Sequence, residues 1–260
     1  MELGLGGKTV VVTGASKGIG RSIAEGFAAE GCNLHIVSRT PEMIERAAQE
    51  IRSEHGVSVT AHTLDLSKSE SVAPLLSAAG DADILVNNAG AIPGGDLQAI
   101  DEARWREAWD LKVFGYINLC RAFYAVMQKK RAGVIVNVTG LAADRLDTDY
   151  IAGSAGNASL NAFSRALGSN SFKDGIRVLA ISPGAVETER LVTLLKTRSE
   201  SQFGDPERWR ELVAGLPYGR PATVEEVANV VVFAASACAS YLSGIVINVD
   251  GGHNARGGAF

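Results

Sequence analysis

Short apolar runs and amphipathic stretches alternate along this chain. Apolar runs bounded by turn residues predict buried strands, and apolar residues at helical spacing predict amphipathic helices. The expected strands cover residues 10–12, 34–37, 57–63, 83–86, 133–138, 176–181 and 244–249. The expected helices follow the first strand and then cover residues 41–54, 70–78, 101–129 and 154–170, with one or two more over 188–209, broken near 204–206. A capping box from Thr223 to Glu226 predicts the start of a last, apolar helix.

This alternation predicts the fold class. Continuous apolar strands separated by helices are typical of a parallel sheet covered on both faces, and right-handed crossovers make such a sheet doubly wound. We therefore expect an α/β fold with about seven strands. No repeat or linker-like segment divides the sequence, so residues 1–260 are expected to form one domain.

A glycine-rich turn follows the first strand. Gly14, Gly18 and Gly20 lie between three β-branched residues and a helical pattern. Glycines let the backbone approach a ligand closely, and the first N–H groups of a helix attract anions. The turn is therefore expected to bind phosphate, although its spacing is Gly-x-x-x-Gly-x-Gly rather than Gly-x-Gly-x-x-Gly.

Composition and charge narrow the classes of partner. The chain is 46% hydrophobic and 21% charged with a net charge of −4, and it has no basic run, so nucleic acid is not expected as a partner. Cys32, Cys120 and Cys238 are isolated in apolar settings, which predicts buried thiols in a reducing, cytoplasmic compartment. The four histidines are scattered, so no metal site is expected. The start of the chain lacks a signal-peptide pattern and the apolar tract 227–239 is too short to span a bilayer, so no membrane association is expected.

Four motifs together resemble the short-chain dehydrogenase/reductase family. They are residues 13–20 (TGASKGIG), 87–90 (NNAG), 183–188 (PGAVET) and 250–252 (DGG). The resemblance extends over nearly the whole chain. It implies a single-domain Rossmann fold, an NAD(P) cofactor, a small-molecule substrate and a homo-oligomer, usually a tetramer, otherwise a dimer.

The end of the second strand bears on the choice of cofactor. An NAD site would place a carboxylate there for the ribose 2′-hydroxyl, whereas this chain has Ser38 and Arg39, with Lys17 in the glycine turn. Two cations suit a 2′-phosphate, which favours NADP(H) over NAD(H), although both can also be solvated surface charges. The resemblance assigns adenine contacts to Asp65 and Leu66, ribose contacts to residues 88–90 and nicotinamide contacts to Val186 and Thr188. The full expected cofactor set is Gly14, Ser16, Lys17, Gly18, Ile19, Gly20, Arg39, Asp65, Leu66, Asn88, Ala89, Gly90, Pro183, Gly184, Val186 and Thr188.

The catalytic positions differ from the family pattern. The family uses Asn, Ser, Tyr and Lys, and counting from the fixed motifs places Lys112, Gly140, Gly153 and Asn157 at those positions. The chain is therefore interpreted as a divergent member of the family. A rival alignment makes Tyr150 the family tyrosine and puts Ser154 in the place of the lysine.

A relocated catalytic set can replace the missing one. Tyr150 lies about one helical turn before Gly153, so its phenol can serve as the acid with Lys112 as its electrostatic partner. Thr139 can replace the serine hydroxyl, and Asn157 can hold the ribose. The alternatives are that Tyr150 packs at the rim of the pocket and that Lys112 is a surface lysine.

These expectations define a function. The sequence predicts an NADP(H)-dependent oxidoreductase with an atypical active site, which transfers hydride to or from a small, partly apolar carbonyl, alcohol or imine. Residues 188–216 are expected to form a substrate lid. A non-redox enzyme and an NADP-binding protein without turnover remain alternatives, because fold does not fix function.

Overall fold

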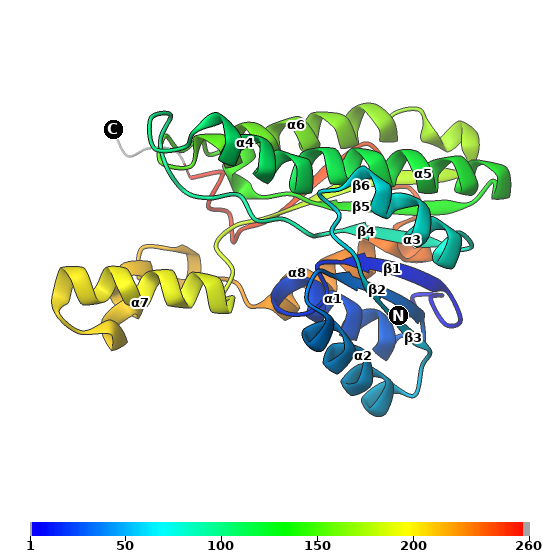
Figure 1. The fold of residues 1–260 in the computed structure, drawn as a ribbon, viewed down its shortest axis with the longest axis horizontal. Coiled ribbons are helices and arrows are strands. Elements are labelled where there is room, and N and C mark those ends of the chain that lie inside the picture. The colour runs from blue at the N-terminus through cyan, green and yellow to red at the C-terminus, as the bar shows by residue number, and fades with distance from the viewer. Residues whose placement is uncertain (1, 257–260) are drawn as a thin grey trace.

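The computed structural model describes residues 2–256 and contains one seven-stranded sheet, drawn in Figure 1. Every strand pairs in parallel with its neighbours, in the order β3-β2-β1-β4-β5-β6-β7. The seven expected strands and the doubly wound α/β fold are confirmed. The strands are β1 (Thr9–Thr13), β2 (Asn33–Ser38), β3 (Val59–Thr63), β4 (Ile84–Asn87), β5 (Gly133–Val138), β6 (Ile176–Pro183) and β7 (Val246–Val249).

Helices cover both faces of the sheet. One layer contains α1 (Gly18–Ala29), α2 (Pro41–His55) and α8 (Val224–Ala235), and the other contains α3 (Val72–Ala79), α4 (Glu102–Trp109), α5 (Gly115–Lys130) and α6 (Ile151–Gly168) (Figure 1). The capping box of α8 is formed by Thr223 and Glu226. Alternate side chains of one strand serve the two layers: Val10 and Val12 join the core beneath α1, α2 and α8, while Val11 joins the core beneath α3 and α5.

The sheet order reverses between β1 and β4. β1 leads outward to β2 and β3 on one side, whereas β4 leads to β5, β6 and β7 on the other. The chain segments that leave the carboxyl ends of β1 and β4 therefore run in opposite directions. The crevice between them is where ligands bind in sheets of this kind. The glycine turn follows β1 and residues 88–90 follow β4, so both lie at this crevice.

Two helices differ from the expected boundaries. The expected helix over 101–129 is divided into α4, a π-helical segment Asp110–Phe114, and α5. The expected helix over 154–170 starts three residues earlier, since α6 begins at Ile151 with Tyr150 as its N-cap. π-helical segments are rare and frequent at functional sites, and the early start brings Tyr150 within one turn of Gly153.

α7 (Glu189–Phe203) projects away from the sheet (Figure 1). A turn of 3-10 helix, Pro206–Val213, packs back against it after a break at Gly204, as the sequence predicts. Leu195, Trp209 and Val213 form a small core of their own there. Within the segment expected to form a lid, Leu191 and Leu194 line the central cavity, whereas Leu195 and Trp209 are buried inside this lobe.

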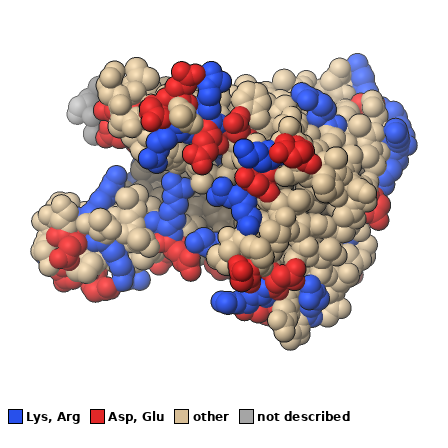
Figure 2. Space-filling view, in the orientation of Figure 1, with Lys and Arg blue, Asp and Glu red and all other residues tan. Residues whose placement is uncertain are grey.

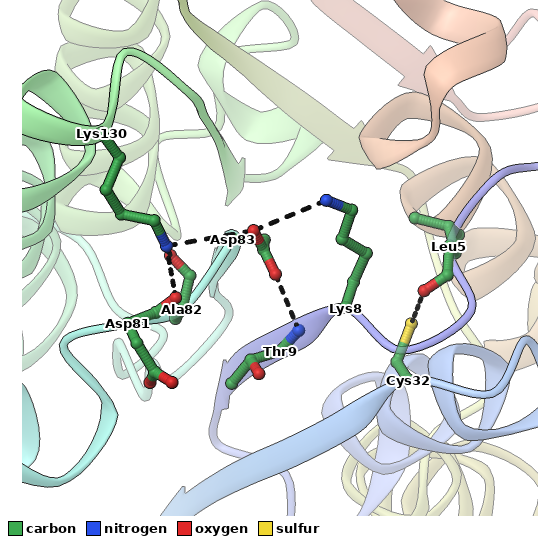
Figure 3. Close-up of polar contacts among 8 residues, drawn as sticks. All are labelled: Leu5, Lys8, Thr9, Cys32, Asp81, Ala82, Asp83 and Lys130. Atoms are coloured by element: carbon green, nitrogen blue, oxygen red, sulfur yellow. Dashed lines mark hydrogen bonds and ion pairs between the residues drawn. The ribbon is translucent and has the colours of Figure 1, made fainter.

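An acidic side chain, Asp83, connects the amino ends of the two central strands, β1 and β4. The Asp83 carboxylate accepts a hydrogen bond of 3.0 Å from the Thr9 amide and lies 3.6 Å from Lys8 Nζ and 3.9 Å from Lys130 Nζ (Figure 3). Asp83 precedes β4 and Thr9 starts β1, so these contacts fix the amino ends of the two central strands. The carboxyl ends, where the crevice lies, carry none of these contacts.

The cysteine prediction is correct at two of three positions. Cys32 and Cys120 are buried, but Cys238 is exposed. Cys238 lies in a 3-10 turn after α8, where its thiol donates to the Glu2 carbonyl 3.2 Å away rather than entering the core. Residues 2–256 contain no helix long and apolar enough to cross a membrane and no group of three or more potential metal ligands.

Candidate active site

A cavity of about 980 Å³ lies at the carboxyl ends of the strands. All the expected site residues except Asp65 line it, including the four expected catalytic residues Tyr150, Lys112, Thr139 and Asn157. The Asp65 carboxylate is turned toward Ser67, accepting 3.1 Å and 2.8 Å hydrogen bonds from its amide and hydroxyl. Leu64 and Leu66 on either side of Asp65 face the cavity instead.

Hydrogen bonds from the end of β4 brace the glycine turn. Thr13 Oγ1 accepts from the Asn88 amide at 2.9 Å and the Ala89 amide at 3.0 Å, and Asn88 Nδ2 donates to the Thr13 carbonyl at 3.1 Å. Gly20 packs so closely that an added Cβ would overlap the Gly14 carbonyl and Asn88. The shape of the turn is therefore set before any ligand arrives.

The start of α1 is suited to an anionic ligand. Its N-cap is Lys17, and in the described structure no side chain caps the helix and no carboxylate lies in its first turn. The first N–H groups of α1 are thus left for the cavity, where a negatively charged group would satisfy them. Gly18 has a positive φ of 58° there, a conformation that glycine adopts readily.

Serine and cations occupy the end of β2. Ser38 Oγ donates to Ser16 Oγ at 3.1 Å, and Arg39 and Lys17 line the cavity beside them. Lys17 Nζ also lies 3.3 Å from the exposed Glu189 carboxylate, a pair that solvent and salt weaken. The donor set at this end is therefore cationic, as a 2′-phosphate requires.

Tyr150 lies against Gly153 inside the cavity wall. A Cβ added at Gly153 would overlap the Tyr150 ring at Cε1 and Cζ, so the ring occupies the space of a side chain at position 153. The ring is half-buried and packs on the cluster of Ile92, Ala108 and Ala152. Ser154, which the rival alignment puts in the place of the family lysine, is buried and accepts from the Asp147 amide at 3.2 Å.

Arg190 is the cation whose field acts on the Tyr150 phenol. Burial raises the pKa of Tyr150, and the Arg190 charge partly offsets that rise. Arg190 lies in the first turn of α7 and donates to the Ile92 carbonyl at 2.9 Å. Since Ile92 belongs to the cluster on which Tyr150 packs, this bond joins α7 to the Tyr150 site.

Lys112 is buried in the wall rather than exposed on a helix surface. Its side chain is 8% exposed, and Nζ donates to the Val138 carbonyl at 2.7 Å and to Tyr116 Oη at 3.0 Å. Burial lowers the pKa of Lys112 to about 7. The charge of Lys112 near neutral pH therefore depends on the groups that contact its amine.

Two further polar side chains complete this wall. Asn157 Nδ2 donates to the Gly153 carbonyl at 2.9 Å, and its buried Oδ1 has no hydrogen-bond partner among residues 2–256. A buried acceptor without a partner is costly, so a donor from a ligand would stabilise it. Thr139 Oγ1 donates to the Ile181 carbonyl at 3.2 Å and keeps its lone pairs for another donor.

Several lining residues lie outside the sequence predictions. Arg190 follows the PGAVET motif, and His253 follows the closing DGG motif, so both were adjacent to predicted positions. Arg145 lines the cavity and donates to the His253 carbonyl at 2.9 Å. Figure 2 shows the hollow between the α7 lobe and the rest of the molecule, with Lys and Arg side chains along its rim.

Comparisons with known proteins identify the family. The model of a family described as "Enoyl-(Acyl carrier protein) reductase" matches residues 14–254. A solved "short chain dehydrogenase/reductase family protein" is 36% identical, with a TM-score of 0.84 and coverage of 98% of this chain and 100% of that one. This chain belongs to the short-chain dehydrogenase/reductase family. Among curated relatives, the 3-oxoacyl-[acyl-carrier-protein] reductase of Chlamydia muridarum is 34% identical over 94% of this chain and 96% of its own length.

Other relatives in this short-chain dehydrogenase/reductase family act on sugars and sugar alcohols by name. L-sorbose reductase from Gluconobacter frateurii, solved in complex with NADPH and L-sorbose, is 32% identical with a TM-score of 0.91, covering 96% of this chain and 98% of its own. The galactitol 2-dehydrogenase of Cereibacter sphaeroides is 33% identical over 96% of each chain. The glycine turn and the cations Lys17 and Arg39 suit a dinucleotide such as the NADPH in the L-sorbose reductase structure.

Proposed function

We propose that this chain is an NADP(H)-dependent oxidoreductase that transfers hydride to or from a small, partly apolar carbonyl, alcohol or imine. The observation that carries the proposal is the Tyr150 ring beside Gly153, in the same cavity as the braced glycine turn. The cationic end of the cavity, with Arg39 and Lys17, supports NADP(H) over NAD(H). Bound NADPH would supply the hydride.

The wall residues have separate roles in this proposal. The Tyr150 phenol is protonated at neutral pH, so it can donate a proton to a carbonyl oxygen as hydride adds to the carbon, and the Arg190 charge counters the rise in pKa that burial causes. Lys112 in its ammonium form supplies positive charge where the oxygen becomes negative. Thr139 Oγ1, whose hydrogen goes to the Ile181 carbonyl, accepts a hydrogen bond from a substrate hydroxyl, and Asn157 holds the ribose through its free Oδ1.

The α7 lobe is proposed to cover the substrate. Leu191 and Leu194 give the mouth of the cavity an apolar side, while Arg145 and His253 give it a polar one. A small carbonyl compound with both apolar and hydroxyl-bearing parts matches this lining. A homo-oligomer, dimer or tetramer, remains a prediction from the family, as does a cytoplasmic location.

A substrate screen tests the proposal. Purified protein is incubated with NADPH and ketones, aldehydes, ketoses such as L-sorbose, 3-oxoacyl carrier-protein substrates and imines, and with NADP⁺ and the matching alcohols. We expect oxidation of NADPH with at least one carbonyl class. Tight NADPH binding without any redox turnover would instead favour the non-redox enzyme or the binding protein without turnover.

Cofactor choice gives a second prediction. Arg39→Ala should raise the Kd for NADPH by about 10- to 100-fold, because it removes a charge-assisted contact with the 2′-phosphate. The Kd for NADH should change less than about threefold, since NADH lacks that phosphate. Fluorescence titration with each cofactor makes the measurement, with Arg46→Ala on the exposed side of α2 as the matched control. Equal losses for both cofactors would contradict a role for Arg39 in phosphate recognition.

A further inference from the structure

Tyr116 lies one helical turn after Lys112 and is the second member of a buried pair in the cavity wall. Tyr116 is 1% exposed, and its hydroxyl lies 3.0 Å from both Lys112 Nζ and the Val138 carbonyl. The π-helical segment Asp110–Phe114 carries Lys112, and α5 carries Tyr116. The pair thus connects the π-helical segment and the start of α5 to Val138 at the end of β5.

The hydrogen positions of the pair follow from donor counting. A phenol has one hydrogen, and the Val138 carbonyl can only accept, so the Tyr116 hydroxyl donates to that carbonyl. Its lone pairs then accept from Lys112. An ammonium group has three N–H donors, of which one goes to Tyr116 Oη and one to the Val138 carbonyl. One N–H is left for the cavity that Lys112 lines.

Two carboxylates, Asp147 and Glu189, line the same cavity as Lys112, but neither pairs with it. No ion pair within residues 2–256 includes Lys112. The titratable neighbours on α5 are Tyr116 and Cys120, and burial raises the pKa of both, so both are neutral at pH 7. From the α6 side, Tyr150 shares the cavity and is also neutral there. Tyr116 therefore supplies one of the few interactions that favour the ammonium, through its hydroxyl and through its ring, whose centroid is 4.8 Å from Nζ.

The path of the lysine stem is also fixed. A Cβ added at Gly90 would lie 2.5 Å from Lys112 Cδ, so the stem crosses the glycine that follows β4. Gly90 leaves room for the stem, and Tyr116 and Val138 hold its end. Both the stem and the terminal amine of Lys112 are thereby held in place.

We propose that Tyr116 is a positioning residue that keeps Lys112 protonated and directs its remaining N–H into the cavity. The proposal rests on the role of Lys112 in the proposed function. Tyr116 itself need not touch the substrate or the cofactor. It acts by accepting a hydrogen bond that is stronger from the ammonium than from the neutral amine, which favours the charged form.

Tyr116→Phe tests the proposal because it removes one oxygen and keeps the ring. Loss of the acceptor should lower the pKa of Lys112 by about one unit, since a hydrogen bond to a charged group favours the charged form. The pKa is measured directly by NMR titration of protein labelled at lysine Cε, with Lys112→Met used to assign the signal. The limb of the kcat profile that falls as Lys112 loses its proton should move to lower pH by the same amount.

Tyr124→Phe is the matched control. It makes the same change on the same helix, but the Tyr124 hydroxyl donates to Asp174 Oδ2 at 2.6 Å, away from the cavity. This variant should leave the Lys112 titration in place. If Tyr116→Phe fails to fold, 4-fluorophenylalanine at position 116 fills the space of the hydroxyl with a much weaker acceptor that cannot ionise, and the shift should have the same direction.

The outcomes separate this proposal from the proposed function. A Lys112 titration unchanged by Tyr116→Phe or by the fluorinated residue overturns the positioning role, whatever the turnover. A shifted titration supports it. Wild-type turnover in Lys112→Met would overturn only the catalytic role of Lys112 in the proposed function, because the titration of Lys112 is read without any substrate.

Discussion

Tyr150→Phe is expected to lower turnover by about 100-fold while leaving the Kd for NADPH within about twofold. The variant removes the proton donor and keeps the ring that packs on Ile92, Ala108 and Ala152. Steady-state kinetics with the substrate found in the screen measures kcat, and fluorescence titration measures the Kd. The loss should fall on kcat rather than on cofactor binding, because the phenol acts at the reacting oxygen.

Two further variants sharpen this result. Tyr241→Phe changes a fully exposed tyrosine and should keep wild-type kcat. Gly153→Ala should lower kcat nearly as far as Tyr150→Phe, since its Cβ would displace the Tyr150 ring. If Tyr150→Phe keeps most of its turnover, Tyr150 packs at the rim of the cavity and the proton comes from another group.

Lys112→Met is expected to stabilise the fold at neutral and acidic pH by about 2–4 kcal/mol. Burial lowers the pKa of Lys112 from 10.5 to about 7, so between these values the unfolded chain binds the proton that the folded chain has lost. The native protein therefore becomes more stable as pH rises from about 7 to 10.5, and it bears the full cost of the buried charge below pH 7. Methionine has similar length and no charge, so its advantage should be largest below pH 7 and shrink through this window.

Urea unfolding of both proteins from pH 6 to pH 10 measures this difference. Lys129→Met, at the exposed end of α5, is the control and should show no such pH dependence. A constant difference between Lys112→Met and the unchanged protein would mean that Lys112 titrates normally in the fold.

The same variant should lower kcat by at least about 10-fold, because the cavity wall loses its positive charge near the developing oxyanion. Higher stability together with lower activity in this variant is what we expect when a buried charge destabilises the fold but serves the function. A wild-type kcat in Lys112→Met would mean that Lys112 has no part in the mechanism, while the predicted gain in stability would still hold.

The fold was predictable because its periodicity is strong. Apolar runs such as residues 10–12 and 133–138 are too short and too rich in β-branched residues to be read as helices, and their alternation with helices restricts the topology. The ends of α6 and the π-helical segment were not predictable, since each depends on side-chain packing that the pattern of the chain does not encode. The exposure of Cys238 was missed for the same reason, because an apolar neighbourhood in sequence does not imply a buried one in space.

The expected cofactor and catalytic residues line one cavity, except for Asp65, and their roles stay predictions. Glycine spacing and the cations Lys17 and Arg39 can be read directly, since backbone approach and charge dictate residue type. Asp65 is an exception, because its carboxylate closes a local turn with Ser67. The roles of Tyr116 and Arg190 depend on contacts between segments far apart in sequence, which no local pattern reports.

The α7 lobe has a small core of its own, formed by Leu195, Trp209 and Val213, which affects how substrate preference can change in evolution and engineering. The apolar side chains that pack on it all come from residues 191–216, so substitutions on the cavity side of this lobe leave the contacts of the main core intact. Substrate preference can then change through residues of this lobe that line the cavity, such as Leu191 and Leu194, while Arg190, Tyr150 and Lys112 stay as they are. A graft of the lobe that keeps Arg190 would carry a new specificity onto this scaffold without losing the bond to the Ile92 carbonyl.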